Sequence, residues 1–184
     1  MGAFVTVYNY LTFRLSASPF GLPASAIGAL FTVYLAGTWS STAAGRLADR
    51  AGRRVVLVLG VVVAIGGVAL TLPASLACIV AGLVAVTAGF FAAHSVASGW
   101  VSGRAKVAPA QASALYLCLY YAGSSVAGTV GGVFYARGGW PQTVAFALVL
   151  LAVAVASAMS LSPRRAAVPP ASPTRRPSRS SRTA

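Results

Sequence analysis

Five apolar stretches of roughly twenty residues each dominate this sequence and limit the folds that the chain can adopt. They run approximately over 25–44, 55–73, 75–100, 111–136 and 142–162. A helix needs about 20 mainly apolar residues to cross about 30 Å of hydrocarbon, because only intrahelical hydrogen bonds can satisfy its backbone there. The pattern therefore predicts an all-α integral membrane protein.

The composition excludes a soluble domain. Of the 184 residues, 58% are hydrophobic and only 8% are charged, whereas a soluble protein typically carries about a quarter charged residues. The formal net charge of +13 would suit a nucleic-acid-binding protein, but such proteins carry their basic groups on a polar surface. We therefore expect the partner to be a lipid bilayer and not a nucleic acid.

A sixth apolar stretch, Gly2 to Leu15, is shorter than the others. At about 1.5 Å per residue it extends about 22 Å, two-thirds of a span. Either this segment is half-buried as it stands, or the chain begins partway into a helix. Proline, glycine and basic residues separate the six stretches. We expect six transmembrane helices, the first of them truncated.

The basic residues indicate an orientation. Twelve of the fourteen Lys and Arg residues fall within 46–54, within 104–106 or in the C-terminal tail. These are alternate loops and the chain end, and short cytoplasmic loops are enriched in Lys and Arg. Both termini are therefore expected on the cytoplasmic side of a multi-pass protein.

The C-terminal tail has a composition of its own. Residues 163–184 contain five Pro, six Arg and four Ser, which cannot bury an apolar core. We expect a six-helix domain over 1–162 followed by a disordered, basic, cytoplasmic tail over 163–184. The tail either fixes the topology as a solvated end or is attracted to anionic lipid headgroups.

Small residues recur every four positions on two of the apolar stretches. One row is Ala81, Ala85, Gly89, Ala93 and Ala97, and a second contains Gly123, Ala127 and Gly131 beside Ser124, Gly128 and Gly132. Small residues on one helix face let two helix backbones approach closely within a membrane. The rows predict a tightly packed helical bundle.

Few polar side chains lie inside the spans besides scattered Ser and Thr: Tyr8, Asn9, Arg14, His94, Tyr116, Tyr120 and Tyr121. Five of them are the candidate residues for a solute cavity: Tyr8, Asn9, Arg14, His94 and Tyr120. An ionisable group at membrane depth usually faces a cavity or a partner. Three interpretations of His94 stay open: a neutral histidine bonded to a neighbouring helix, a cavity-lining group, or a proton relay. Arg14, near a helix end, is also compatible with an anchor at the membrane interface.

Nothing in the sequence predicts a chemical reaction. Asp49 is the single carboxylate residue, which excludes chemistry by paired carboxylates, and neither a Cys/His cluster nor a nucleophile motif is present. We expect no enzyme, no catalytic residue, no metal and no cofactor.

A basic string from Gly45 to Arg54 separates two of the apolar stretches. It predicts a tight turn, which Gly52 permits. Asp49 is expected just ahead of the following helix, where a carboxylate can accept from free N–H groups and meet the positive end of the helix dipole.

This string resembles the signature loop of the major facilitator superfamily, which joins the second and third helices of each half. The matching residues are Gly45, Leu47, Asp49, Arg50, Gly52, Arg53 and Arg54. Further strings resemble the C-terminal half of bacterial arabinose-efflux and drug-efflux permeases: Tyr8-Asn9-Tyr10 with Phe13-Arg14-Leu15, Gly89 to Ser95, and Tyr116 to Gly128 with Gly138-Gly139-Trp140. The resemblance covers residues 1 to about 162.

The resemblance implies one six-helix half of a transporter whose two halves enclose a midplane cavity and rock between two openings. The first and fourth helices of each half line that cavity, which would place Tyr8, Asn9 and His94 near the solute. The signature loop would act as a cytoplasmic gate. The implied function is efflux of a small organic solute or drug across the plasma membrane, the inner membrane of a bacterial cell.

Because a complete member of this family has about twelve helices, the expected partner is an N-terminal half-transporter or a second copy of the chain. The alternative is a membrane fragment or assembly partner that does not transport, since a single half supplies no second wall for alternating access.

Overall fold

The computed structural model describes residues 1–160, which form helices and contain no β-strand. In chain order the elements are α1 (Gly2–Ser16), α2 (Ala24–Ala29), the 3-10 helix η1 (Leu30–Val33), α3 (Tyr34–Ala51), α4 (Arg53–Leu70), α5 (Leu76–Arg104) and α6 (Pro109–Ser160). The predicted all-α class is confirmed for this part of the chain. The tail predicted over 163–184 lies outside the described residues.

Three of these helices, α4, α5 and α6, are long and apolar enough to cross a membrane. The apolar stretches predicted over 55–73 and 75–100 coincide closely with α4 and α5. The stretch predicted over 25–44 forms α2, η1 and the first part of α3, with a 3-10 turn interrupting the α-helix. The expected six crossings go beyond this finding and stay a prediction.

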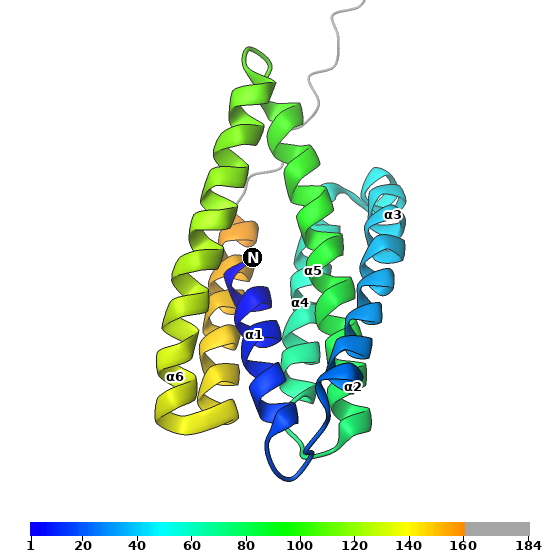
Figure 1. Cartoon of the computed structure of the whole chain (residues 1–184). Helices are drawn as coiled ribbons and strands as arrows, with labels where there is room; N and C mark the ends of the chain where they lie inside the picture. The colour runs from blue at the N-terminus through cyan, green and yellow to red at the C-terminus, as the bar shows by residue number, and fades with distance from the viewer. Residues whose placement is uncertain (161–184) are drawn as a thin grey trace, which may run out of the picture.

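Helix α6 consists of two limbs that reverse direction at a pair of glycines. Gly138 and Gly139 have non-helical backbone angles, and Gly139 has a φ of 60°, a left-handed value that favours glycine. The limbs before and after this pair run side by side in opposite directions (Figure 1). The break expected between the stretches predicted over 111–136 and 142–162 is therefore confirmed. It is short, since Trp140 and Pro141 already belong to the second limb.

The connections gather at two ends of the bundle. The links after α1 and α4 and the reversal within α6 lie at the bottom of Figure 1, whereas the α3–α4 and α5–α6 connections lie toward the top. The N-terminus lies at mid-height, so α1 occupies only the lower part of the bundle.

Gly52 alone forms the connection between α3 and α4. Its φ of 90° is unfavourable for any residue with a Cβ. Its N–H donates to the carbonyl of Ala48 at 3.0 Å, and its carbonyl accepts from the N–H of Val56 at 3.3 Å. One residue therefore closes α3 and opens α4, which confirms the predicted turn.

Helices α4 and α5 pack backbone against backbone through buried glycines. A Cβ built at Gly60 would lie 2.8 Å from the carbonyl oxygen of Gly89, and one built at Gly67 would lie 2.7 Å from that of Gly82. Such separations leave no room for a side chain. The two glycines on each helix are seven residues apart, which is about two helical turns and places them on one face.

Helices α1 and α6 pack in a similar way, with added hydrogen bonds. The Thr6 hydroxyl donates to the carbonyl of Ala127 at 3.0 Å, and the Tyr10 hydroxyl donates to that of Gly128 at 2.8 Å. Thr6 also lies against Gly131. The row of small residues predicted around Gly123 to Gly132 is thus the surface that receives α1.

The row predicted on α5 is only partly correct. Ala81 is exposed, whereas its neighbour Gly82 is buried against α4. A row with a strict spacing of four rotates about 40° per step around a helix of 3.6 residues per turn, so it cannot stay on one face over five members. The packed face instead contains Gly82, Ala85, Gly89 and Ala93.

Two adjacent glycines on α4 test the close contact between α4 and α5. We expect Gly67→Ala to destabilise the fold by roughly 1–3 kcal/mol, because the added methyl overpacks the interface. Gly66→Ala is the matched control: nothing lies within 4 Å of its Cβ position, and alanine is the better helix former by about 0.5–1 kcal/mol. Thermal denaturation of the purified protein in detergent checks both. Equal effects of the two substitutions would contradict the packing described.

A substitution at Gly52 tests the left-handed backbone conformation of this turn. Nothing lies within 4 Å of its Cβ position, so Gly52→Ala should act only through the positive φ and cost roughly 1–3 kcal/mol. Gly45→Ala, at an open helical position, should be neutral or slightly stabilising. If Gly52→Ala melted at the wild-type temperature, the left-handed turn would be wrong.

Candidate functional site

A cavity of about 440 Å³ lies between α1 and the segment from η1 to the start of α3. We call it the Tyr8 cavity. It is lined by Met1, Phe4, Val5, Tyr8, Asn9, Tyr10, Thr12, Phe13, Phe31 and Tyr34. Aromatic rings and a few polar groups therefore face one hollow, a combination that suits an organic solute.

The two predicted residues that line this cavity, Tyr8 and Asn9, differ in their exposure and in their hydrogen bonding. The Tyr8 ring is buried, and its hydroxyl lies 2.6 Å from the Thr87 hydroxyl of α5. Because the Thr87 hydrogen is donated to the carbonyl of Leu83 at 2.7 Å, Tyr8 is the donor to Thr87. Asn9 is exposed, and its side-chain amide is available to a solute.

A second cavity, of about 210 Å³, lies inside the bundle. Two further predicted residues line it, His94 of α5 and Tyr120 of α6. We call it the His94 cavity. It is lined by Met1, Ala3, Phe4, Leu57, Val61, Ala64, Val68, Val86, Gly89, Phe90, Ala93, His94, Ala97, Tyr116, Tyr120, Leu151 and Ala154. Met1 and Phe4 line both cavities, so the two hollows are neighbours.

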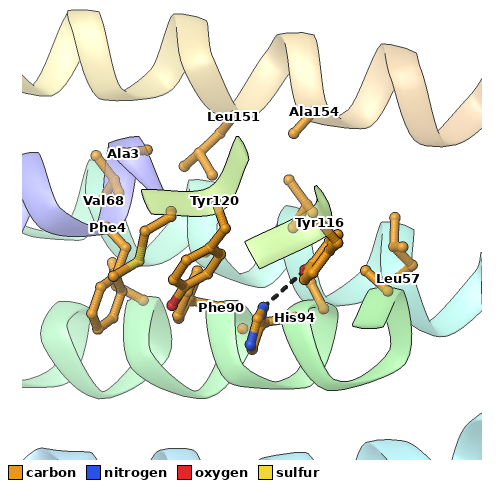
Figure 2. A pocket seen from close by; sticks show the side chains of 17 residues that line it. Ala3, Phe4, Leu57, Val68, Phe90, His94, Tyr116, Tyr120, Leu151 and Ala154 are labelled. Carbon is orange, nitrogen blue, oxygen red and sulfur yellow. Dashed lines mark hydrogen bonds between the residues drawn. The ribbon is translucent and has the colours of Figure 1, made fainter. Parts of the chain in front are cut away.

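His94 is held by aromatic residues. Its Nδ1 lies 2.9 Å from the Tyr116 hydroxyl, and its ring lies 4.7 Å from that of Tyr120 and 5.7 Å from that of Phe90. Figure 2 shows His94 and Tyr116 joined by this hydrogen bond, with Phe90 and Tyr120 beside them. Tyr116 was expected inside a span but not among the cavity candidates; its spacing of four from Tyr120, which puts both on one helix face, is the signal that could have found it.

Arg14 lies away from both cavities, at the end of α1 near the α4–α5 connection. Its guanidinium donates to the carbonyls of Thr71, Leu72 and Pro73, the last two at 3.0 and 3.1 Å. It also lies over the rings of Phe20 and Trp140 at 5.6 and 5.4 Å. In this position Arg14 joins the end of α1 to the α4–α5 connection and to Trp140.

The basic string lies at the opposite end of the bundle. Gly45, Leu47, Asp49 and Arg50 belong to α3, and Arg53 and Arg54 begin α4. Asp49 therefore lies in the last turn of α3 and not ahead of α4, so the expected capping role is wrong; Gly52 occupies that position without a side-chain bond. The helix continues to Ala51 because Leu, Ala and Arg are strong helix formers.

Two arginines of the string reach neighbouring helices. Arg53 donates to the carbonyl of Gly99 on α5 at 3.4 Å, and Arg54 donates to that of Met159 near the end of α6. Asp49 and Arg53 line a hollow of about 220 Å³ with residues of α5. The string, which runs from α3 into α4, thus contacts α5 and α6 at one end of the bundle.

The described residues offer no metal site, since residues 1–160 contain no group of three His, Cys, Asp or Glu side chains that could hold an ion.

The model of the Major Facilitator Superfamily matches residues 1–184. Among curated proteins, the chain is 47% identical over 155 residues to the inner membrane transport protein YnfM of Escherichia coli (strain K12), covering 84% of this chain and 37% of that protein. It is 40% identical to an uncharacterized transporter of Buchnera aphidicola (subspecies Schizaphis graminum), covering 88% and 39%. It is also 40% identical to the uncharacterized MFS-type transporter YybF of Bacillus subtilis (strain 168), covering 84% and 38%.

No solved structure matches the chain. The chain spans 37–39% of the length of the curated relatives named above. Since the family model matches along the whole sequence and these relatives are at least 40% identical, the chain belongs to the major facilitator superfamily.

Proposed function

We propose that this chain is the C-terminal six-helix half of a permease that moves a small organic solute or drug out of the cell by alternating access. The observation that carries the proposal is the Tyr8 cavity, which presents aromatic rings and the exposed Asn9 in a member of a transporter family. The names of the relatives support transport in general. The direction of transport, out of the cell, is proposed from the resemblance to efflux permeases.

The solute contacts follow from the two cavities. Asn9 supplies hydrogen-bonding groups and Tyr34 an aromatic ring at the Tyr8 cavity, and Tyr8 is held in position by Thr87. His94 and Tyr120 lie in the neighbouring cavity, and Arg14 holds the end of α1 through its three carbonyl contacts. We propose the Tyr8 cavity as the surface that faces the solute.

Six crossings account for the arrangement of the helices. They are α1, the segment from α2 to α3, α4, α5 and the two limbs of α6. The first of them, α1, has 15 residues and is about 22 Å long. The second wall of the solute cavity would come from an N-terminal half-transporter or a second copy of the chain. This agrees with a chain that spans 37–39% of the length of its relatives.

The distribution of charge supports the orientation. The α3–α4 and α5–α6 connections lie toward the same end of the bundle in Figure 1. The basic residues in or near them are Arg46, Arg50, Arg53, Arg54, Arg104 and Lys106. Arg14 and Arg137 lie near the opposite connections. Under the positive-inside rule the first end is cytoplasmic. We propose a multi-pass protein of the bacterial inner membrane with both termini in the cytoplasm.

The basic string is proposed as the cytoplasmic gate. Arg53 and Arg54 bond to carbonyls of α5 and α6 within this half, while Asp49 and Arg50 are exposed. The exposed pair is therefore free to contact the other half, and Asp49 would stabilise one of the two conformations of the gate.

Solute flux tests the proposed function. In inside-out membrane vesicles we expect the intact transporter to take up a pentose or a lipophilic dye, with L-arabinose and ethidium as probes. Asn9→Ala should raise the half-saturating concentration roughly tenfold, equivalent to about 1.4 kcal/mol of binding. Ser25→Ala, at an exposed position on α2, should leave it unchanged.

The chain by itself should give no flux. Transport by this chain alone at the rate of the intact protein would contradict its assignment as one half. Absence of flux of any organic solute through the intact protein would favour a membrane assembly partner instead.

The gate is tested by removing one charge. We expect Asp49→Asn in the intact transporter to lower the maximal rate about tenfold, or about 1.4 kcal/mol, with solute affinity unchanged, because the carboxylate acts on the conformational step. Rates from flux assays and affinities from equilibrium binding separate the two effects, and Lys106→Gln serves as the control. Unchanged efflux at normal expression would exclude the gate role.

A further inference from the structure

Aromatic side chains dominate the lining of the Tyr8 cavity. Six of its ten lining residues carry an aromatic ring: Phe4, Tyr8, Tyr10, Phe13, Phe31 and Tyr34. All ten lie within the described residues, and none of them has a charged side chain. Asp49, the single carboxylate residue of the sequence, lies in the last turn of α3 and does not line this cavity. A solute in the cavity therefore meets aromatic rings and neutral polar groups of this chain.

Three of these rings, those of Tyr8, Phe31 and Tyr34, form a cluster that we call the aromatic wall. The centroid of the Tyr8 ring lies 5.6 Å from that of Phe31 and 5.2 Å from that of Tyr34. The rings of Phe31 and Tyr34 lie 6.0 Å apart with an angle of only 8° between their planes. Phe31 belongs to η1, and side chains three positions apart eclipse each other in a 3-10 helix. The interruption between α2 and α3 therefore places these two rings side by side against α1.

The lining hydroxyls of α1 offer a solute mainly hydrogen-bond acceptors. The Tyr8 hydroxyl donates to Thr87, and the Tyr10 hydroxyl donates to the carbonyl of Gly128. The Thr12 hydroxyl donates to a backbone carbonyl of its own helix at 2.6 Å. A hydroxyl that has donated its one hydrogen presents only lone pairs to a solute. These oxygens favour a positively charged group over a solute that needs several donors, such as a sugar.

An aromatic ring has a negative face, which attracts a cation that lies within about 6 Å of the ring centroid. We infer that the solute of the Tyr8 cavity is an organic cation of the quaternary-ammonium type, held by the aromatic wall and not by a carboxylate. The inference rests on the proposed transport function and narrows its solute to one chemical class. An anionic solute would meet no cationic side chain in this lining.

Equilibrium binding of radiolabelled tetraethylammonium to the purified intact transporter tests the inference. The Phe31 ring is replaced by trifluorophenylalanine, which keeps nearly the same size but has a weaker negative face because fluorine withdraws electron density. The matched control is the same replacement at Phe146, which stacks on Phe134 at 4.7 Å and lines neither cavity. A second pair, Tyr34→Phe and Tyr34→Leu, keeps or removes a ring at the neighbouring position of the wall.

We expect the fluorinated Phe31 and Tyr34→Leu each to weaken tetraethylammonium binding about tenfold, the size of a cation–π contact shielded from water. The fluorinated Phe146 and Tyr34→Phe should bind as the wild type does, and L-arabinose should not compete. Melting temperatures of the variants in detergent show that each is folded.

Equal binding by the proteins fluorinated at Phe31 and at Phe146 would overturn the inference, because the cation would then not depend on the negative ring face. Flux of L-arabinose without any binding of tetraethylammonium would also overturn it, while the transport proposal would stand. Ring-dependent binding of tetraethylammonium without flux of any organic solute would support the cation site and contradict transport. The two proposals therefore fail in distinguishable ways.

Discussion

Close approach of helix backbones is the constraint on which the rest of this structure depends. Apolar side chains gain little by leaving lipid for the interior of a helical bundle, so association relies on dense packing and hydrogen bonds. Gly67 and Gly82 bring α4 against α5, and the surface around Gly131 receives α1. These contacts fix where α1 and α5 lie, and with them the positions of Tyr8 and His94.

A single guanidinium secures the end of α1. Arg14 donates to three carbonyls around the α4–α5 connection, and the indole N–H of Trp140 donates to the same Thr71 carbonyl at 3.1 Å. These carbonyls belong to the α4–α5 connection, just beyond the end of α4 at Leu70, so the bonds hold this connection against the end of α1 and against Trp140. At the opposite end, Arg53 and Arg54 bond to carbonyls of α5 and α6. Basic residues thus join helices at both ends of the bundle.

The sequence errors have a common origin in helix geometry. Asp49 was expected ahead of a helix but lies inside one, because the residues around it favour helix and the chain stops only at Gly52, where φ is positive. The row beginning at Ala81 was expected to pack but rotates away from the interface, which Gly82 occupies. Composition gave the correct type of contact for the row of small residues, but rotation about the helix axis decided which residues make it. For Asp49, the position of the helix end removed the expected contact.

The amino-acid sequence by itself determined the all-α class, the positions of the apolar helices, the reversal at Gly139 and the turn at Gly52. Each follows from local properties, namely hydropathy over about 20 residues and the φ angles that only glycine adopts readily. Only the tertiary structure decided that Tyr8 meets Thr87 across 79 residues and that His94 bonds to Tyr116. It also decided that four of the candidate residues divide between two cavities while Arg14 lies away from both. Those contacts depend on how each helix is rotated and crossed against its neighbours, and no local pattern in the sequence specifies that geometry.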